Sequence, residues 1–501
     1  MTSEDNNKEE NNHKEDDAEI QNDVLVETQH TVTIDGVEIA YTVTCGTIVL
    51  KEESEKKGEQ EGEAEGEKPK ATIFFIAYTR DDVQDKNTRP VTFSFNGGPG
   101  SSSVWLHLGV LGPRRVVMGD AGDLLPPPYK LEDNAFSLLD ESDLVFIDPV
   151  GTGYSRAVPG ERAKQFFSFK KDIESVGDFI RLYLSRYKRW NAPKFLIGES
   201  YGTTRAAGLS GYLQERHGVF LNGIMLISSI LNFQNNRFDQ GNDLPYILIL
   251  PTYAATAWYH KRLPDDLQAD LRSALDEAQA FAGGEYSQAL MKGAALPPNE
   301  RKDIVSKLSR YTGLASEFIE RCDLRVELSR FTKELLRDEA RTVGRLDSRF
   351  KGIDRDSAGE HIEHDPSMSA TMGPYTATFN QYVRAELEFE SDLPYEILNF
   401  NTNRAWSFND HENRYVNVAE TLRKAMTINP HLKVFVGSGF YDMATPYFAS
   451  EYTFNHLGLD PSRQENVSMD YYEAGHMMYV HMPSLEKMKG DLVAFIRDAL
   501  S

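Results

Sequence analysis

The stretch KFLIGESYGTTRAAGLSGYL, residues 194–213, decides the fold class of this chain. Its apolar run at 195–197 is typical of a buried strand, and the segment after 202 has the small residues of a closely packed helix. Between them lies GESYG (198–202), whose glycines permit a cramped turn. Strand, turn and helix in this order predict a nucleophile elbow that projects the Ser200 hydroxyl above a sheet edge. The alternative is a plain Gly-Ser turn before a helix.

The segments around this elbow predict an α/β fold with a central, mostly parallel sheet. Strand-like runs alternate with helix-period segments, and the alternation stops for some 150 residues of charged amphipathic helices before it returns. We therefore expect a helical cap, residues 241–400, inserted between two parts of one core, 24–240 and 401–501. The expected core elements are strands at 91–95, 144–148, 223–228, 431–436 and 465–472, and helices at 167–187 and 485–500.

The N-terminal region combines a hairpin with two acidic stretches. Residues 1–70 hold 20 acidic and 7 basic side chains. Alternation over 30–50 around Asp35-Gly36 predicts a β-hairpin. The low-complexity stretches have too little apolar surface to offset the entropy of ordering. They predict a disordered acidic tail at 1–23 and a long surface loop at 51–70, before a strand at 71–78.

Composition excludes several classes of protein. The 501 residues carry a net charge of −23, which argues against nucleic acid as a partner. No apolar run reaches the roughly 18–20 residues of a membrane span, and the acidic start lacks the layout of a secretory signal, so we expect a cytoplasmic chain. Cys45 and Cys322 alone provide neither a disulfide framework nor a cysteine-based zinc site.

Two downstream residues are candidates to activate Ser200. A serine hydroxyl needs a base, and the base needs a third group that fixes its tautomer. Asp442 follows the strand-like KVFVGSGFYD and His476 follows SMDYYEAG, so both fall in loops that leave strand ends. Two alternatives stay open: Asp442 caps a helix near Pro446, or His476 is an ordinary hydrogen-bonded histidine with His481 as a rival base.

The strand at 91–95 leads into NGGPG (96–100), which predicts an oxyanion hole. Glycines let backbone N–H groups face a substrate oxygen. The expected donors are the amides of Gly98 and of Tyr201, the residue after the nucleophile. The alternative is a tight loop without catalytic meaning.

Five motifs occur in order along the chain: FNGGPGSSSVWLHLGVLGPRR (95–115), DLVFIDPVGTGYSR (143–156), IGESYG (197–202), GSGFYDMATP (437–446) and EAGHM (473–477). Together they resemble the serine carboxypeptidase family. The resemblance implies an α/β-hydrolase fold with a helical cap, and a metal- and cofactor-free enzyme that removes the last residue of peptides with a free C-terminus. In that family the residues matching Asn96 and Glu199 bind the terminal carboxylate, and Gly97 adds a backbone donor.

Carboxylate binding by Glu199 has a physical condition. Asn96 offers an N–H₂ donor, but Glu199 can help to bind an anion only when it carries a proton itself. The pair should therefore favour binding at acidic pH.

The chain departs from the family pattern at two positions. Val110 stands where many members have a further glutamate, and Ser101 stands where secreted members have a cysteine, so the chain resembles an unstapled, bacterial-type branch. The missing acid leaves endopeptidase, esterase or acyltransferase activity on the same triad open. A non-catalytic binding protein is the remote alternative.

Weaker signals carry no assignment. His361 and His364 could form a metal pair if they lie on a helix, and otherwise belong to a solvated loop. Asp148 could line the site or cap a turn. The aromatic residues Trp105, Tyr154 and Tyr246 could shape side-chain pockets, but each is rather expected in the core.

Overall fold

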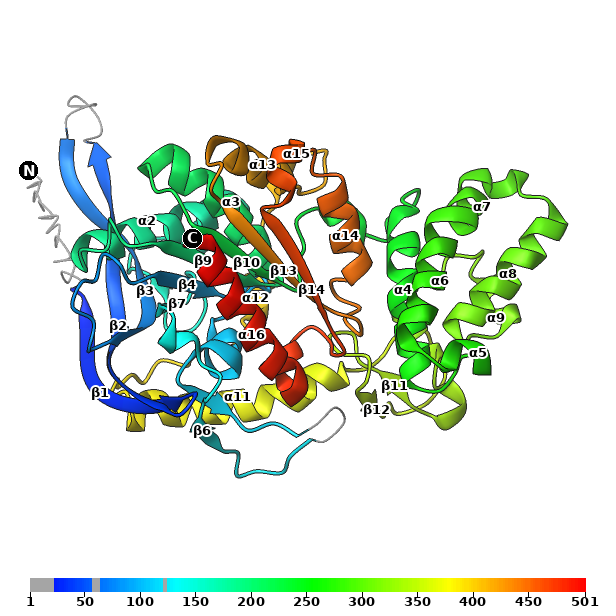
Figure 1. The fold of residues 1–501 in the computed structure, drawn as a ribbon, viewed down its shortest axis with the longest axis horizontal. Coiled ribbons are helices and arrows are strands. Elements are labelled where there is room, and N and C mark those ends of the chain that lie inside the picture. Colours follow the sequence, from blue (N-terminus) through cyan, green and yellow to red (C-terminus); the bar gives the residue numbers. More distant parts are fainter. Residues whose placement is uncertain (1–21, 56–63, 120–123) are drawn as a thin grey trace, which may run out of the picture.

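The computed structural model describes residues 22–55, 64–119 and 124–501, and its centre is a twisted, mostly parallel sheet (Figure 1). The strand order is β1-β2-β3-β7-β4-β9-β10-β13-β14, and β8 pairs with β3. Every neighbour from β7 to β14 is parallel, so the predicted α/β class is confirmed. The bounds are β1 Val24–Ile34, β2 Val37–Glu55, β3 Ala64–Arg80, β4 Val91–Phe95, β7 Asp143–Ile147, β8 Arg156–Ala157, β9 Lys194–Glu199, β10 Gly223–Ile227, β13 Lys433–Gly439 and β14 Val467–Tyr472.

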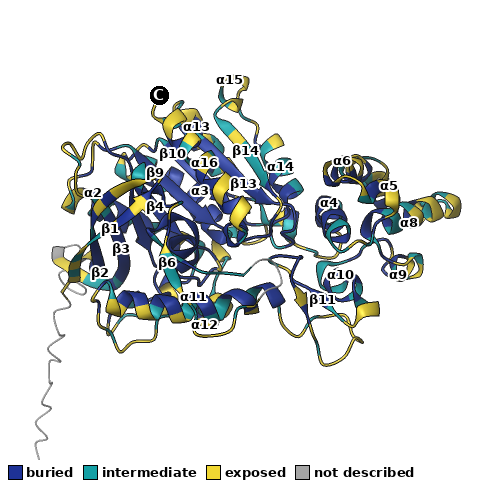
Figure 2. Ribbon diagram, turned by 60° about the horizontal axis from the view of Figure 1, so that its bottom comes forward, coloured by how far each residue is buried: buried dark blue, intermediate teal, exposed yellow. Residues whose placement is uncertain are grey.

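Helices cover both faces of the sheet, which explains why its central strands are mostly apolar (Figure 2). Strands β4, β7, β9 and β10 are buried at every position. One apolar cluster joins the sheet to α2 (Phe169–Arg186), α3 (Tyr201–His217) and α13 (Ala419–Ile428). A second cluster joins it to α11 (Pro366–Ala385) and α16 (Met482–Ala499).

The predicted N-terminal hairpin is confirmed. Strands β1 and β2 pair in antiparallel register up to Ile34 and Val37, and both turn residues, Asp35 and Gly36, have positive φ angles of 48° and 78°.

The predicted surface loop at 51–70 is wrong at both ends. Strand β2 continues to Glu55 and β3 begins at Ala64, because the ladder paired through Leu50 and Ala71 extends beyond them, with register shifts after Leu50 and after Ser54. The register also places Glu52 opposite Lys68, an attractive cross-strand pair. Residues 56–63, and residues 1–21 of the predicted acidic tail, lie outside the described residues.

The middle of the chain is helical. Helices α4 to α10 lie beside the sheet in Figure 1 and share their own apolar cluster, whereas α11 packs on the sheet. Among the described residues, no helix is long and apolar enough to cross a bilayer. The bounds are α4 Leu244–Tyr259, α5 Asp265–Gln268, α6 Leu271–Phe281, α7 Ser287–Lys292, α8 Pro298–Thr312, α9 Ser316–Arg321 and α10 Leu328–Glu334.

Candidate active site

The elbow around Ser200 joins the end of β9 to the start of α3, as the sequence predicts. Ser200 has φ 60° and ψ −129°, a conformation that costs a non-glycine residue about 1–3 kcal/mol and is concentrated at functional sites. A side chain at Gly198 would collide with the carbonyl of Gly202. The flanking glycines are therefore a steric requirement of the turn.

Asp442 and His476 meet at the same carboxyl edge of the sheet. Asp442 follows β13 and His476 follows β14, and the imidazole Nδ1 lies 2.7 Å from Asp442 Oδ2. The other oxygen, Oδ1, accepts the N–H groups of Ala444 and Thr445, so Asp442 also supports the turn before Pro446. The alternative that Asp442 caps a helix near Pro446 is wrong, because α14 (Tyr447–Asn455) begins without a side-chain cap and Asp442 bonds only the loop before it and His476.

The electrostatics of this pair favour a histidine that can hold a proton. Burial disfavours both charged forms, since Asp442 is fully buried and His476 is 4 % exposed. Their mutual attraction outweighs burial: the pKa of His476 is raised and that of Asp442 is lowered. Because Asp442 occupies Nδ1, the nitrogen open to a substrate proton is Nε2. His481 bonds Ser484 instead and lines neither cavity beside Ser200.

The NGGPG loop lies directly against the elbow. A side chain at Gly97 would collide with the backbone nitrogen of Tyr201, so the loop can approach this closely only with glycine there. Gly98 and Tyr201 border the same cavity as Ser200. The structure therefore brings together the two residues whose amides are expected to hold the oxyanion.

Glu199 and Asn96 form a buried pair beside Ser200. Asn96 Nδ2 donates to Glu199 Oε1 at 3.0 Å, and the Tyr479 hydroxyl donates to Oε2 at 2.7 Å. Burial raises the pKa of Glu199 to about 7, because His476 and the neutral donors Tyr479 and Asn96 offset only part of the desolvation. Glu199 therefore exchanges its proton near neutral pH.

Tyr479 is a functional candidate that sequence reasoning missed. Its ring fills the space beside Gly109, so any side chain at 109 would collide with it. The next residue, Val110, is buried in the π-helical turn His107–Leu111. A phenol thus holds Glu199 near the position where Val110 replaces an acid. The available signal was that Tyr479 lies three residues after His476.

Arg205 is a second residue that the sequence reading missed. It is almost fully buried, its Nε lies 2.8 Å from Asp172 Oδ2, and its Nη1 donates to the carbonyl of Asn96. One guanidinium thus fixes α2, α3 and the NGGPG loop to one another. An arginine on the small-residue face of the predicted helix was the available signal.

Two cavities meet at Ser200. The larger, about 480 Å³, contains Tyr201 and side chains of the inserted helices, including Ile249. The smaller, about 370 Å³, contains Asn96, Glu199 and His476. Apolar side chains complete the smaller cavity: Trp105, Leu346, Met368, Leu398, Phe400, Ala444 and Met477.

The residues without an assigned role in the sequence lie partly at the cavities, partly in the core and partly in an irregular segment. Trp105 and Tyr154 both lie in the core, and Trp105 also borders the smaller cavity, while Tyr246 is partly buried against the apolar cluster of the inserted helices. Asp148 is buried and accepts the N–H of Ser103 at 2.8 Å, so it supports the loop after NGGPG. His361 and His364 lie in an irregular segment and not on a helix, and no three possible metal ligands cluster within the described part of the chain.

Comparison with known proteins agrees with this geometry. The serine carboxypeptidase family model matches residues 62–487. Serine carboxypeptidase-like 36 of Arabidopsis thaliana is 29 % identical over 164 residues, 32 % of each chain. Pheromone-processing carboxypeptidase KEX1 of Saccharomyces cerevisiae is 33 % identical over 135 residues, 26 % of this chain and 17 % of the relative. The matches thus span about a third or less of these curated relatives.

A solved structure shares the fold. That of Kex1, a prohormone-processing carboxypeptidase from Saccharomyces cerevisiae, has a TM-score of 0.55 at 17 % identity and covers 91 % of both chains. This likeness identifies the α/β-hydrolase fold. Because the family model also matches most of the sequence, the chain belongs to the serine carboxypeptidase family.

Proposed function

We propose that this protein is a serine carboxypeptidase that removes the last amino acid from peptides with a free C-terminus. One observation carries the proposal: Ser200, the buried Asp442–His476 pair and the buried Asn96–Glu199 pair adjoin one another around a single cavity. The first pair suits activation of a hydroxyl, and the second suits recognition of a carboxylate.

The first half of the reaction forms an acyl-enzyme. Ser200 Oγ attacks the last peptide carbonyl while His476 Nε2 takes the hydroxyl proton. Asp442 stabilises the resulting imidazolium through Nδ1. The amides of Gly98 and Tyr201 hold the negative oxygen of the tetrahedral intermediate. His476 then gives its proton to the departing amine, and the C–N bond breaks.

The second half releases the shortened peptide. Water attacks the acyl ester, His476 takes a proton from the water, and the same proton returns to Ser200 Oγ as the ester bond breaks. Every proton is transferred by His476, so the sequence of steps draws on this chain's own residues.

Recognition of the terminal carboxylate makes the reaction an exopeptidase reaction. Asn96 Nδ2 and the Gly97 amide donate to the carboxylate, and Glu199 donates only while it is protonated. Two adjacent anions would repel each other, so ionised Glu199 opposes binding. Productive turnover requires protonated Glu199 together with neutral His476.

Matched peptides test the proposal. One peptide carries a free C-terminus, the second has the same sequence with a C-terminal amide, and the third is the corresponding ester. Mass spectrometry follows each between pH 5 and pH 8. We expect the free-acid peptide to lose single residues and the amidated peptide to react far more slowly. Equal rates for the free acid and the amide would contradict carboxypeptidase action, and turnover of the ester alone would identify an esterase.

A further inference from the structure

A short segment after the inserted helices is fastened to both loops that carry the triad. We call residues 345–349 the strap. The N–H of Met443, next to Asp442, donates to the carbonyl of Arg345 at 3.1 Å, and the N–H of His476 donates to the carbonyl of Leu346 at 2.6 Å. The strap therefore has a fixed position relative to the reacting groups.

A buried ion pair fixes the strap further. Arg349 Nη2 lies 2.6 Å from Asp347 Oδ2, and that oxygen also accepts the N–H of Gly475 at 3.1 Å. Arg349 Nη1 donates to the carbonyl of Glu473. These contacts bind the strap to the residues just before His476, so its side chains keep their orientation toward the site.

Two strap residues, Arg345 and Leu346, border the smaller cavity, and Arg345 is the charged one. It lines both the larger and the smaller cavity beside Ser200, and its positive charge opposes protonation of His476. Its side chain is exposed and makes no ion pair with any carboxylate in the described ranges. Unlike the charge of Arg349, the charge of Arg345 remains available to a bound substrate.

The smaller cavity is the place for the leaving amino acid, because Asn96 and Glu199 lie in its wall. Its remaining surface is mostly apolar, and 370 Å³ holds one large side chain. Glu199 is the only carboxylate among the described lining residues, and Asn96 and Tyr479 occupy its oxygens. While Glu199 is protonated, as binding of the terminal carboxylate requires, no described residue of this wall carries a negative charge that would neutralise a lysine or arginine side chain.

We propose that Arg345 and the apolar wall of the smaller cavity select a large apolar C-terminal residue and reject a basic one. This inference rests on the proposed function, because it assigns the smaller cavity to the residue that carboxypeptidase action releases. A cation entering beside the guanidinium is repelled, whereas an apolar side chain is desolvated favourably.

Three peptides that differ only in a last residue of Leu, Glu or Lys test the inference. We expect kcat/KM to be highest for Leu and at least about tenfold lower for Lys, since like charges in a partly exposed cavity repel with this order of magnitude. Arg345→Glu should make kcat/KM higher for the Lys peptide than for the Glu peptide. Arg345→Gln should reduce the difference in kcat/KM between these two peptides.

Arg341→Glu is the matched control. Arg341 precedes the strap, contacts the carbonyl of Ala340 and lines neither cavity, so its reversal should leave the Lys-to-Glu ratio unchanged. Added salt gives an independent readout without substitution: raising it from about 0.05 to about 0.5 M should narrow the difference between the Lys and Glu peptides in the unaltered enzyme.

A Lys-to-Glu ratio that stays within twofold of the unaltered enzyme in Arg345→Glu, with no salt effect, would overturn the inference. Failure of the proposed function has a different signature, because then none of the three peptides loses its last residue. Ratios of rates within one variant are unaffected by partial loss of folded protein, so the comparison remains decisive if Arg345→Glu is less stable.

Discussion

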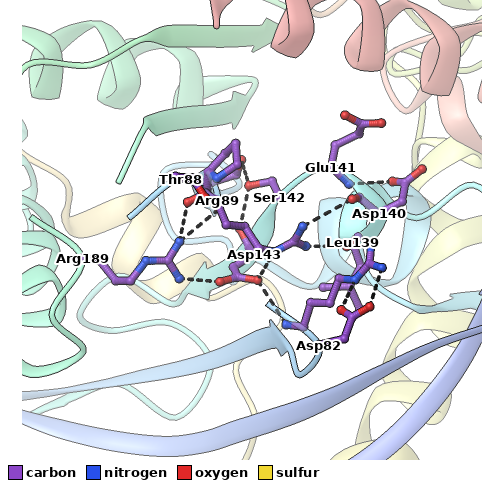
Figure 3. A network of polar contacts seen from close by, with 12 residues as sticks. Asp82, Thr88, Arg89, Leu139, Asp140, Glu141, Ser142, Asp143 and Arg189 are labelled. Atoms are coloured by element: carbon purple, nitrogen blue, oxygen red, sulfur yellow. Dashed lines mark hydrogen bonds and ion pairs between the residues drawn. The ribbon is translucent and has the colours of Figure 1, made fainter. Parts of the chain in front are cut away.

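Two buried clusters of charge lie at opposite ends of the same parallel strands, and they are built differently. At the amino ends, Asp143 of β7 is held by Arg89 and Arg189 (Figure 3). At the carboxyl ends, Glu199, Asp442 and His476 surround Ser200. Burial is similar in both clusters, so burial alone does not distinguish a structural cluster from a reactive one.

Compensation of charge distinguishes them. Asp143 has one arginine on each oxygen, and these guanidinium groups also donate to backbone carbonyls, including that of Leu139 at 2.6 Å. Glu199 has only the neutral donors Asn96 and Tyr479. These hydrogen bonds and the nearby His476 offset only part of the cost of burying Glu199, so its pKa rises to about 7. The amino-end cluster joins neighbouring strands through ion pairs, while the carboxyl-end cluster contains Glu199, a carboxyl group that can gain or lose a proton near pH 7.

Asp442→Asn should have the largest effect on activity. An asparagine retains the turn but cannot stabilise the imidazolium, so kcat should fall about 10³- to 10⁴-fold. Steady-state kinetics on a free-acid peptide measures this, with thermal unfolding as the control for folding. Activity within tenfold of the original would remove Asp442 from the mechanism.

Asp143→Asn should lower the stability of the protein and leave its activity nearly unchanged. It leaves two buried arginines without their carboxylate, and breaking a buried pair in this way typically costs about 3–5 kcal/mol. Urea unfolding should therefore show a large loss of stability, while kcat/KM per folded molecule stays within about twofold. A protein of unchanged stability would contradict the structural role of the amino-end cluster.

Glu199→Gln should change the pH profile. In the unaltered enzyme, the ratio of kcat/KM for free-acid and amidated peptides should fall about tenfold per pH unit above pH 7, because Glu199 loses its proton there. Both peptides need neutral His476, so the titration of His476 affects both values of kcat/KM equally and does not change their ratio. Glutamine is neutral at every pH, so the fall should disappear. A ratio that declines as before would contradict the carboxylate role of Glu199.

Tyr479→Phe should have the smallest effect. Losing the phenol removes a hydrogen bond to ionised Glu199, which raises the pKa of Glu199 further and moves the fall of the same ratio to higher pH. At pH 8 the ratio should rise about fivefold, the value of one ordinary hydrogen bond. The control is Tyr472→Phe, because the Tyr472 hydroxyl donates to Asp491, outside both cavities. Equal behaviour of the two variants would exclude a positioning role for Tyr479.

The sequence predicts the parts of the site that obey local rules. Ser200 follows from its flanking glycines, and Asp442 and His476 follow from loops at strand ends. No local sequence pattern predicts the role of Tyr479 or of the strap, because both roles depend on contacts between segments that are distant in the sequence. The Tyr479–Glu199 bond, for instance, joins residues 280 positions apart. The extension of β2 and β3 into an acidic stretch likewise depends on cross-strand pairing, which composition does not reveal.

Covalent labelling tests the central claim, that the Asp442–His476 pair activates Ser200, most directly. A fluorophosphonate should add once to the unaltered protein, and peptide mapping should place the adduct on Ser200. Ser200→Ala should abolish the adduct, and His476→Ala should slow its formation by orders of magnitude at neutral pH. An adduct on another residue, or labelling of His476→Ala at the original rate, would contradict the account.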